Sequence, residues 1–253
     1  MKAEYIILNP SFFIKHMDSI ASFLDEGVIR FSDKIRIVGM DRGRICVLEL
    51  LMGDDYIKTT NIKELEAPVD LFSISKIMKR FSNPEELYIS YDEMSNAVTI
   101  KGKIKNRTKT FKSQTIDIDM TDFEDPIPKL SKIKYNAVFQ IEANELLDAM
   151  KDVELFAEFF TIESSDNNIR ISASNPTGEC ITDIEIEDLY GNEKSSYQTE
   201  RIKKIIKPIG NCKVLIMFNS NYPIAIYDKL SSKSHMLYYL APRVVDEDEE
   251  DDY

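Results

Sequence analysis

Apolar residues recur at helical spacing, every three or four positions, in four segments of the chain. These segments are residues 9–26, 70–82, 142–158 and 199–209. Their ends carry matching signals, because Asn9 and Pro10 suit the start of the first segment and Gly210 follows the last. Each segment therefore predicts an amphipathic helix with one face in the core.

Between these helices, apolar and polar residues alternate, which is the pattern of strands buried on one face. The predicted strands are residues 28–31, 34–39, 44–52, 87–92, 97–104, 109–119, 159–164, 168–173, 180–187, 212–218, 222–229 and 235–240. The phrase Ile35-Arg36-Ile37 returns as Ile169-Arg170-Ile171, 134 positions later (169 − 35). Because each half reads helix, strands, helix, strands, the chain predicts a duplicated α+β unit with antiparallel sheets.

The two halves join near residues 123–129, a segment with two prolines and two acids. Proline disrupts helix and strand interiors, so the sequence predicts an extended surface linker. Composition alone leaves open whether this linker is a plain connector or takes part in binding.

Basic residues gather on the second helix of each half. Lys76, Lys79 and Arg80 share one face of segment 70–82, and segment 199–209 carries Arg201, Lys203, Lys204 and Lys207. The first helices are weaker, with Lys15 in one and Lys151 in the other. A solvated helix face explains one such stripe, but its recurrence in both halves favours a surface that faces phosphates. No aromatic residues interleave with these bases, so contacts to the nucleic-acid backbone rather than to bases are expected.

A second basic stretch covers residues 101–112, with six bases and no acid. Strand alternation would place Lys101, Lys103, Lys105, Arg107 and Lys109 on one face of a hairpin. The stretch is either a second basic surface or an edge strand that lysines protect against aggregation, and the second interpretation is favoured.

Composition narrows the function classes. The chain has 32 Lys+Arg against 44 Asp+Glu, a net charge of −12, and seven of the acids form residues 246–252. Such a block is typically disordered and solvated. The apolar run 214–218 is far shorter than the roughly 20 residues of a transmembrane helix. No secretory signal is recognisable, and three widely separated cysteines offer no disulfide framework, so an intracellular location is expected.

Catalytic patterns are missing from the sequence. His16 and His235 have no neighbouring Cys/His set at metal-binding spacing, and the eight glycines are scattered singly. No nucleophile elbow appears. The sequence therefore predicts no catalytic residue, no metal site and no cofactor, and a protein that is not an enzyme.

Several phrases, in order along the whole chain, resemble the PCNA family of DNA sliding clamps. They are the C-terminal Tyr238-Tyr239-Leu240-Ala241-Pro242-Arg243 before an acidic tail, Gly39-Met40-Asp41 with Arg44-Ile45-Cys46-Val47, residues 69–80, Ser195-Ser196-Tyr197 and Tyr222-Pro223-Ile224. The resemblance implies an α+β, duplicated two-domain clamp fold, with helices lining the inside of a ring and antiparallel sheets outside. It implies domains at 1–120 and 134–245, a connecting linker at 121–133 and a disordered acidic tail at 246–253.

The resemblance also implies site residues. Three subunits would pair head to tail around duplex DNA, and the expected DNA-facing residues are Lys15, Lys76, Lys79, Arg80, Lys151, Arg201, Lys203, Lys204 and Lys207. The expected pocket for a partner peptide comprises Met40, Arg44, Ile45, Val47, Phe123, Ile127, Pro223, Tyr239, Leu240, Ala241 and Pro242, although Val47 and Leu240 also suit a plain core role. The expected subunit interface includes Lys109, Lys112, Glu179, Asp183 and Glu185.

The same resemblance implies these partners: double-stranded DNA, a DNA polymerase, a clamp loader, a ligase and a flap nuclease. It implies no binding to a membrane. Two departures put partner preference in question: Arg44 replaces a histidine common in the family, and residues 124–128 differ from its usual linker pattern. Two other functions stay open. The chain could be one subunit of a heterotrimeric replicative or checkpoint-type clamp, or an acidic two-domain scaffold that does not contact DNA. The compartment would be the cytoplasm or nucleoid in an archaeon and the nucleus in a eukaryote.

Overall fold

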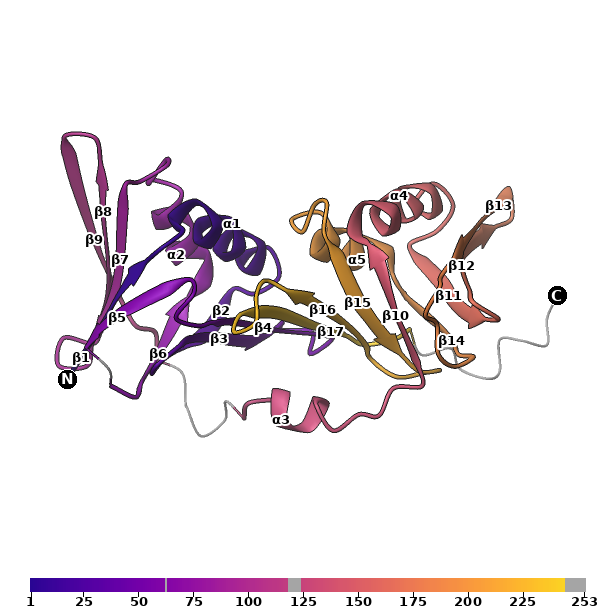
Figure 1. Ribbon diagram of the computed structural model, residues 1–253, viewed down its shortest axis with the longest axis horizontal. Helices are drawn as coiled ribbons and strands as arrows, with labels where there is room; N and C mark the ends of the chain where they lie inside the picture. Colours follow the sequence, from indigo (N-terminus) through magenta and orange to yellow (C-terminus); the bar gives the residue numbers. More distant parts are fainter. Residues whose placement is uncertain (62, 118–123, 244–253) are drawn as a thin grey trace. The chain divides into compact units, whose positions relative to one another are not determined.

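The computed structural model describes residues 1–61, 63–117 and 124–243 (Figure 1). The chain forms two compact units. The first contains residues 1–132 and 229–237, and the second contains residues 133–228 and those from 238 onward. The domain boundaries at 120 and 134 stay predictions, since residues 118–123 and the tail 246–253 lie outside the described residues.

The first unit builds two antiparallel layers. In one, the strand order is β5-β1-β7-β8-β9, and in the other β6, β2, β3 and β4 are neighbours. The strands are β1 (Lys2–Ile7), β2 (Glu26–Phe31), β3 (Ile35–Met40), β4 (Cys46–Met52), β5 (Ile57–Asn61), β6 (Leu65–Asp70), β7 (Glu86–Asp92), β8 (Ala97–Ile104) and β9 (Arg107–Gln114). The helices are α1 (Pro10–Ala21), α2 (Leu71–Met78) and the short α3 (Ile127–Leu130).

The second unit repeats this plan. Its strands are β10 (Ala137–Glu142), β11 (Phe159–Ser165), β12 (Asn168–Asn175), β13 (Gly178–Glu185), β14 (Lys194–Gln198), β15 (Lys213–Phe218) and β16 (Ile224–Lys229). One sheet has the order β13-β12-β11-β14, and in the other β10, β15 and β16 are neighbours. The last strand, β17 (His235–Leu240), crosses the boundary between the units at residue 237. The helices of the second unit are α4 (Ala143–Val153) and α5 (Thr199–Ile206).

In each unit the two long helices pack side by side, α1 with α2 and α4 with α5 (Figure 1). Local signals fix where the first pair begins. The Asn9 side chain accepts a hydrogen bond from the Phe12 amide (3.2 Å), and Asp70 accepts one from the Ser73 amide (2.8 Å). Their apolar faces are buried, which explains why short helices are stable here.

All four predicted amphipathic helices are present, but each is shorter than its pattern. The first ends at Ala21 rather than residue 26, and the chain then tightens, because the Phe23 amide bonds to the Ile20 carbonyl three residues back (3.0 Å). Leu24, which continued the periodicity, is still buried, but from the turn that follows. Periodicity therefore located the buried residues better than it located the helix ends.

The linker prediction needs a correction. Residues 123–129 were expected to be extended, but Ile127–Leu130 form a single helical turn. Pro126 and Pro128 sit at and just inside its start, where a missing N–H costs no intrahelical bond. Across the described residues, no helix is long and apolar enough to span a membrane.

Candidate functional site

The basic residues of the first unit lie at the end of α2. Lys76 is exposed and lies over the Phe72 ring, 3.9 Å from its centroid. Lys79 and Arg80 are also exposed, but they follow the helix rather than belong to it, since α2 ends at Met78. Lys79 forms an ion pair with Asp18 of α1 (2.5 Å). Lys15 of α1 is exposed as well.

The second unit carries the corresponding bases on α5. Lys204 and Lys207 are exposed, whereas Arg201 and Lys203 are half-buried. Lys203 pairs with Glu154, and Lys204 pairs with Glu200 (3.4 Å). Lys151 of α4 is exposed and pairs with Asp148 (3.3 Å). Ion pairs of this exposed kind contribute about 0–1 kcal/mol each, so a phosphate group can replace the carboxylate partner.

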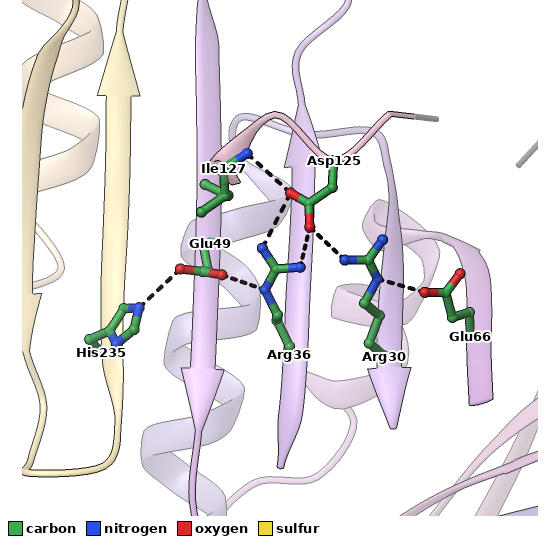
Figure 2. Close-up of polar contacts among 7 residues, drawn as sticks. All are labelled: Arg30, Arg36, Glu49, Glu66, Asp125, Ile127 and His235. Atoms are coloured by element: carbon green, nitrogen blue, oxygen red, sulfur yellow. Dashed lines mark hydrogen bonds and ion pairs between the residues drawn. The ribbon is translucent and has the colours of Figure 1, made fainter. Parts of the chain in front are cut away.

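A charged network holds the linker segment on the first unit (Figure 2). The Asp125 carboxylate accepts hydrogen bonds from Arg36 Nη1 (2.5 Å) and Nη2 (3.2 Å) and from Arg30 Nη1 (2.5 Å). It also accepts the amide of Ile127 (3.1 Å), which starts the turn of α3. Asp125 therefore connects the linker to two neighbouring strands, β2 and β3.

The same network continues to both sides (Figure 2). Arg30 forms an ion pair with Glu66 of β6 (2.7 Å). Arg36 donates its Nε–H to Glu49 of β4, and the other oxygen of Glu49 lies 3.0 Å from His235 Nε2. Charges of opposite sign thus alternate across the sheet, and each guanidinium lies between two carboxylates.

Burial would favour neutral forms of these groups, but hydrogen bonding prevails. Burial raises the pKa of Asp125, yet its bonds from Arg36 and Ile127 hold that pKa below its usual range. Burial likewise raises the pKa of Glu49, and the bonds from His235 and Arg36 lower it further than burial raises it. Both carboxylates are therefore ionised at neutral pH. Their contribution to stability is present above the ordinary carboxyl pKa, near 4, and is lost as the pH falls through the lower folded pKa.

The residues expected for a peptide pocket in the first unit gather at the β3–β4 connection. The Asp41 carboxylate accepts the amides of Ile45 (2.8 Å) and Cys46 (2.9 Å), which fixes this turn. Arg44 has a positive φ of 56° and is exposed. Met40 and Ile45 are 36% and 38% exposed, so they are available to a ligand, whereas Val47 is buried. Ile127 is also buried, and Phe123 lies outside the described residues.

In the second unit, the expected pocket residues lie at the end of β17 and before β16. Tyr239 and Leu240 are buried, and Ala241 and Pro242 are half-buried. The carbonyl of Pro223 accepts a hydrogen bond from the Tyr135 hydroxyl (3.0 Å). The burial of Val47 and Leu240 favours the alternative that these two residues are core.

The residues expected at a subunit interface lie on two edge strands, β9 of the first unit and β13 of the second. Lys112, Glu179 and Glu185 are exposed on them. Lys109 instead donates to the carbonyl of Arg80 (2.8 Å), and Asp183 pairs with Arg170 of β12 (2.8 Å), which lowers the pKa of Asp183. Two of the five predicted side chains therefore already have partners within their own chain.

The basic stretch 101–112 does not form a single face. Ile104 pairs with Arg107, so Lys105 lies in the two-residue turn of the β8–β9 hairpin, with a positive φ of 53°. Lys103 lies opposite Thr108, and Lys109 lies opposite the buried Gly102. The turn therefore places Arg107 and Lys109 on the face opposite to Lys101 and Lys103. The prediction of one face with five bases is wrong because it ignored this turn.

Known proteins of similar sequence and fold match this chain over nearly its whole length. No protein-family model matches the chain. It is 27% identical to a DNA polymerase sliding clamp of Methanothermobacter thermautotrophicus over 252 residues, covering 96% of this chain and 98% of that protein. It is 24% identical to a DNA polymerase sliding clamp of Nitrosopumilus maritimus, covering 90% and 93% of the two chains.

Among solved structures, the chain is similar to PCNA from Thermococcus kodakaraensis, with a TM-score of 0.84 and 18% identity, over 95% of this chain and 100% of that one. The chain has the fold of the PCNA-type sliding clamps. The predicted resemblance to this family and the predicted duplicated α+β clamp fold are both confirmed.

Sequence reasoning missed the network around Asp125. Arg30 and Arg36 lie in strands rich in Val and Ile. An arginine there needs an acceptor for its guanidinium group if that group is to be buried. These two arginines in apolar strands were the sequence signal for a buried charged network. Nothing in the sequence identified Asp125, rather than Glu124, as the partner.

We expect Asp125→Ala to destabilise the helical turn α3 of the linker and its attachment to β2 and β3. The substitution removes four hydrogen bonds from a carboxylate that is only 15% exposed, and such bonds contribute about 1–3 kcal/mol in sum when part-buried. Exchange of the Leu130 and Ser131 amides, which close the α3 turn, should speed up about tenfold, measured by hydrogen exchange.

Glu124→Ala is the matched control, because Glu124 carries the same charge, adjoins Asp125 and forms an exposed ion pair with Lys129 (2.7 Å). It should leave these exchange rates unchanged. Equal acceleration in both variants would show that Asp125 is not the anchor.

Proposed function

We propose that this protein is a DNA sliding clamp that encircles duplex DNA and tethers a replicative polymerase, which raises processivity. The observation that carries the proposal is similarity to sliding clamps in sequence and in fold over more than nine-tenths of the chain. Exposed basic residues on or just after the helices of both units support it. In a chain of net charge −12, bases concentrated on corresponding helices favour a polyanion inside the ring and an acidic exterior that repels it.

The proposed DNA contacts are made by the bases of α1, α2, α4 and α5 and their ends: Lys15, Lys76, Lys79, Arg80, Lys151, Arg201, Lys203, Lys204 and Lys207. Lysine and arginine contacts to phosphates carry no sequence information, so the ring can move along any duplex. Topology rather than affinity retains the ring, so each contact can be weak. A polymerase bound to it stays at a high effective concentration near the primer end.

Partner proteins are proposed to dock a short peptide against Met40 and Ile45, whose apolar side chains are exposed beside the rigid Asp41 turn. The linker segment held by Asp125 belongs to the same unit and would add to this site. Ala241 and Pro242 stay part of the pocket that the resemblance implies. The polymerase, clamp loader, ligase and flap nuclease are the proposed users of this site. No catalytic role and no cofactor are part of the proposal, and an intracellular location follows from a role in replication.

Ring closure is proposed to pair β9 of one subunit with β13 of the next. Both are edge strands of eight residues, so backbone hydrogen bonds supply most of the interaction. Lys112 opposite Glu179 or Glu185 would add favourable charge. Lys109 and Asp183 contribute less than the sequence implied, because they are engaged within their own chain.

The DNA-facing assignment can be tested with a triple variant, Lys76→Ala, Lys79→Ala and Arg80→Ala. It removes three phosphate contacts per subunit, so stimulation of a DNA polymerase should fall at least about threefold at low salt, measured as primer-extension length. The matched control is Lys58→Ala, Lys63→Ala and Lys229→Ala, which removes the same charge from exposed positions outside the helices. Equal stimulation by both triple variants would overturn the assignment.

The oligomeric state separates the clamp from its alternatives. A chain that closes its own ring should sediment near 87.6 kDa, three times 29.2 kDa, at micromolar concentration. Because backbone pairing rather than charge dominates the proposed interface, this mass should persist at 0.5 M salt. A mass near 29.2 kDa at every salt concentration would favour a heterotrimer subunit or a scaffold, and it would contradict the self-closing ring.

A further inference from the structure

The two repeats differ at one sheet edge. Ala3, Tyr5 and Ile7 of β1 are buried, and so are Ala137, Phe139 and Ile141 of β10, at a spacing of 134 positions. In the first repeat, β1 lies between β7 on one side and β5 on the other. In the second repeat, β10 has the corresponding strand β15 on one side, but no strand takes the place of β5 within the described residues.

Loop length accounts for the difference. The connection from β4 to β6 has twelve residues (53–64) and includes β5, whereas that from β13 to β14 has only eight (186–193). The shorter connection touches β10 at a single bridge, where Val138 and Tyr190 exchange two backbone hydrogen bonds (3.2 and 3.3 Å). Gly191 then passes so close to Asn136 that a Cβ atom would lie 2.4 Å from its carbonyl oxygen. The connection therefore leaves the edge after one residue pair.

This geometry leaves the middle of the β10 edge open. Outward-facing backbone groups recur every second residue along an antiparallel strand, so Gln140 points its N–H and C=O the same way as Val138. The equivalent residue of the first repeat, Ile6, lies opposite Lys58 of β5, and the Leu8 amide bonds to the Tyr56 carbonyl (2.9 Å). In the described structure, the outward groups of Gln140 have no such partner.

A groove of about 610 Å³ runs along this open edge. Val138, Leu215 and the 66%-exposed Tyr190 supply apolar surface to it. Its acidic lining residues far outnumber its one base, Lys213; they are Glu142, Glu145, Glu185, Glu187 and Asp188. None of these five carboxylates forms an ion pair with another described residue.

We propose that the open edge of β10 binds an extended basic peptide segment of another protein, which pairs with β10 in the place that β5 occupies in the first repeat. Backbone pairing at Gln140 would supply direction and register, as in other cases of strand addition. Alternate side chains of the peptide would reach the apolar floor, and the others, Lys or Arg, would meet Glu142, Glu145, Glu187 and Asp188, since Glu185 lies on the β13 edge proposed for ring closure. This site is separate from the proposed peptide pocket around Met40, and it does not depend on the clamp function.

The probe is a labelled heptapeptide, Lys-Val-Lys-Val-Lys-Val-Lys with both ends blocked, titrated into the full chain by fluorescence anisotropy. Two further versions carry N-methyl groups on the even or on the odd residues. A strand that joins an edge uses the amides of only one set, so one version should bind at least about tenfold more weakly and the other should bind nearly as well. Exchange of the Gln140 amide should slow when the unmodified peptide is bound.

Two charge variants complete the test. Glu187→Lys with Asp188→Lys should weaken binding at least about tenfold. Asp33→Lys with Glu64→Lys, which makes the same charge change at exposed positions of the first unit, should change binding less than about threefold. The proposal is overturned if no peptide binds at 1 mM, if both methylated versions bind equally, or if both charge variants weaken binding alike. The last two results would indicate general attraction to an acidic protein, or charged residues that merely guard an edge.

Discussion

An antiparallel sheet ends in strands whose outward N–H and C=O groups lack partners, and such edges bind other chains unless they are covered. The uncovered sheet edges are therefore the places where this protein can pair with other chains. The described edges β9 and β13 each expose a full strand, and they belong to different units of one chain. Head-to-tail pairing of these two edges, as proposed for the ring, would satisfy the outward backbone groups of both strands. The edge strand β10 is bridged at Val138 alone, which leaves the backbone groups of Gln140 open to a further partner.

The charged side chains have two different roles, which depend on how far they are buried. Exposed ion pairs such as Lys204–Glu200 are weak and exchangeable, so they leave the helix bases available to phosphates. The Asp125 network differs because Asp125, Arg36 and Glu49 are mostly buried, and both oxygens of Asp125 and of Glu49 have a hydrogen-bond partner. Breaking one member would leave an uncompensated charge in a poorly solvated place. The same residue types therefore serve a mobile surface at the helices and a fixed attachment at the linker.

The sequence predicted the four long helices and most strands because their apolar periodicity spans several turns or residue pairs. It missed β1, β5, β6, β10 and β14. Four of these strands, β1, β6, β10 and β14, lead into a helix with at most two residues between, so a helical pattern follows each of them at once. The basic face of 101–112 failed for a different reason, since a two-residue turn reverses which face each residue occupies. The Asp125 network and the open edge of β10 depend on contacts between distant segments, and local patterns carry no information about those.

The central claim is that topology retains this protein on DNA. The most direct measurement loads the chain onto nicked circular plasmid with a clamp loader, removes free protein by gel filtration in about 0.3 M salt, and then linearises half of the sample. A ring that encircles the duplex and makes only weak phosphate contacts should stay on the circle and leave the linear DNA within minutes. Equal retention on both forms, or loss from both, would contradict the account.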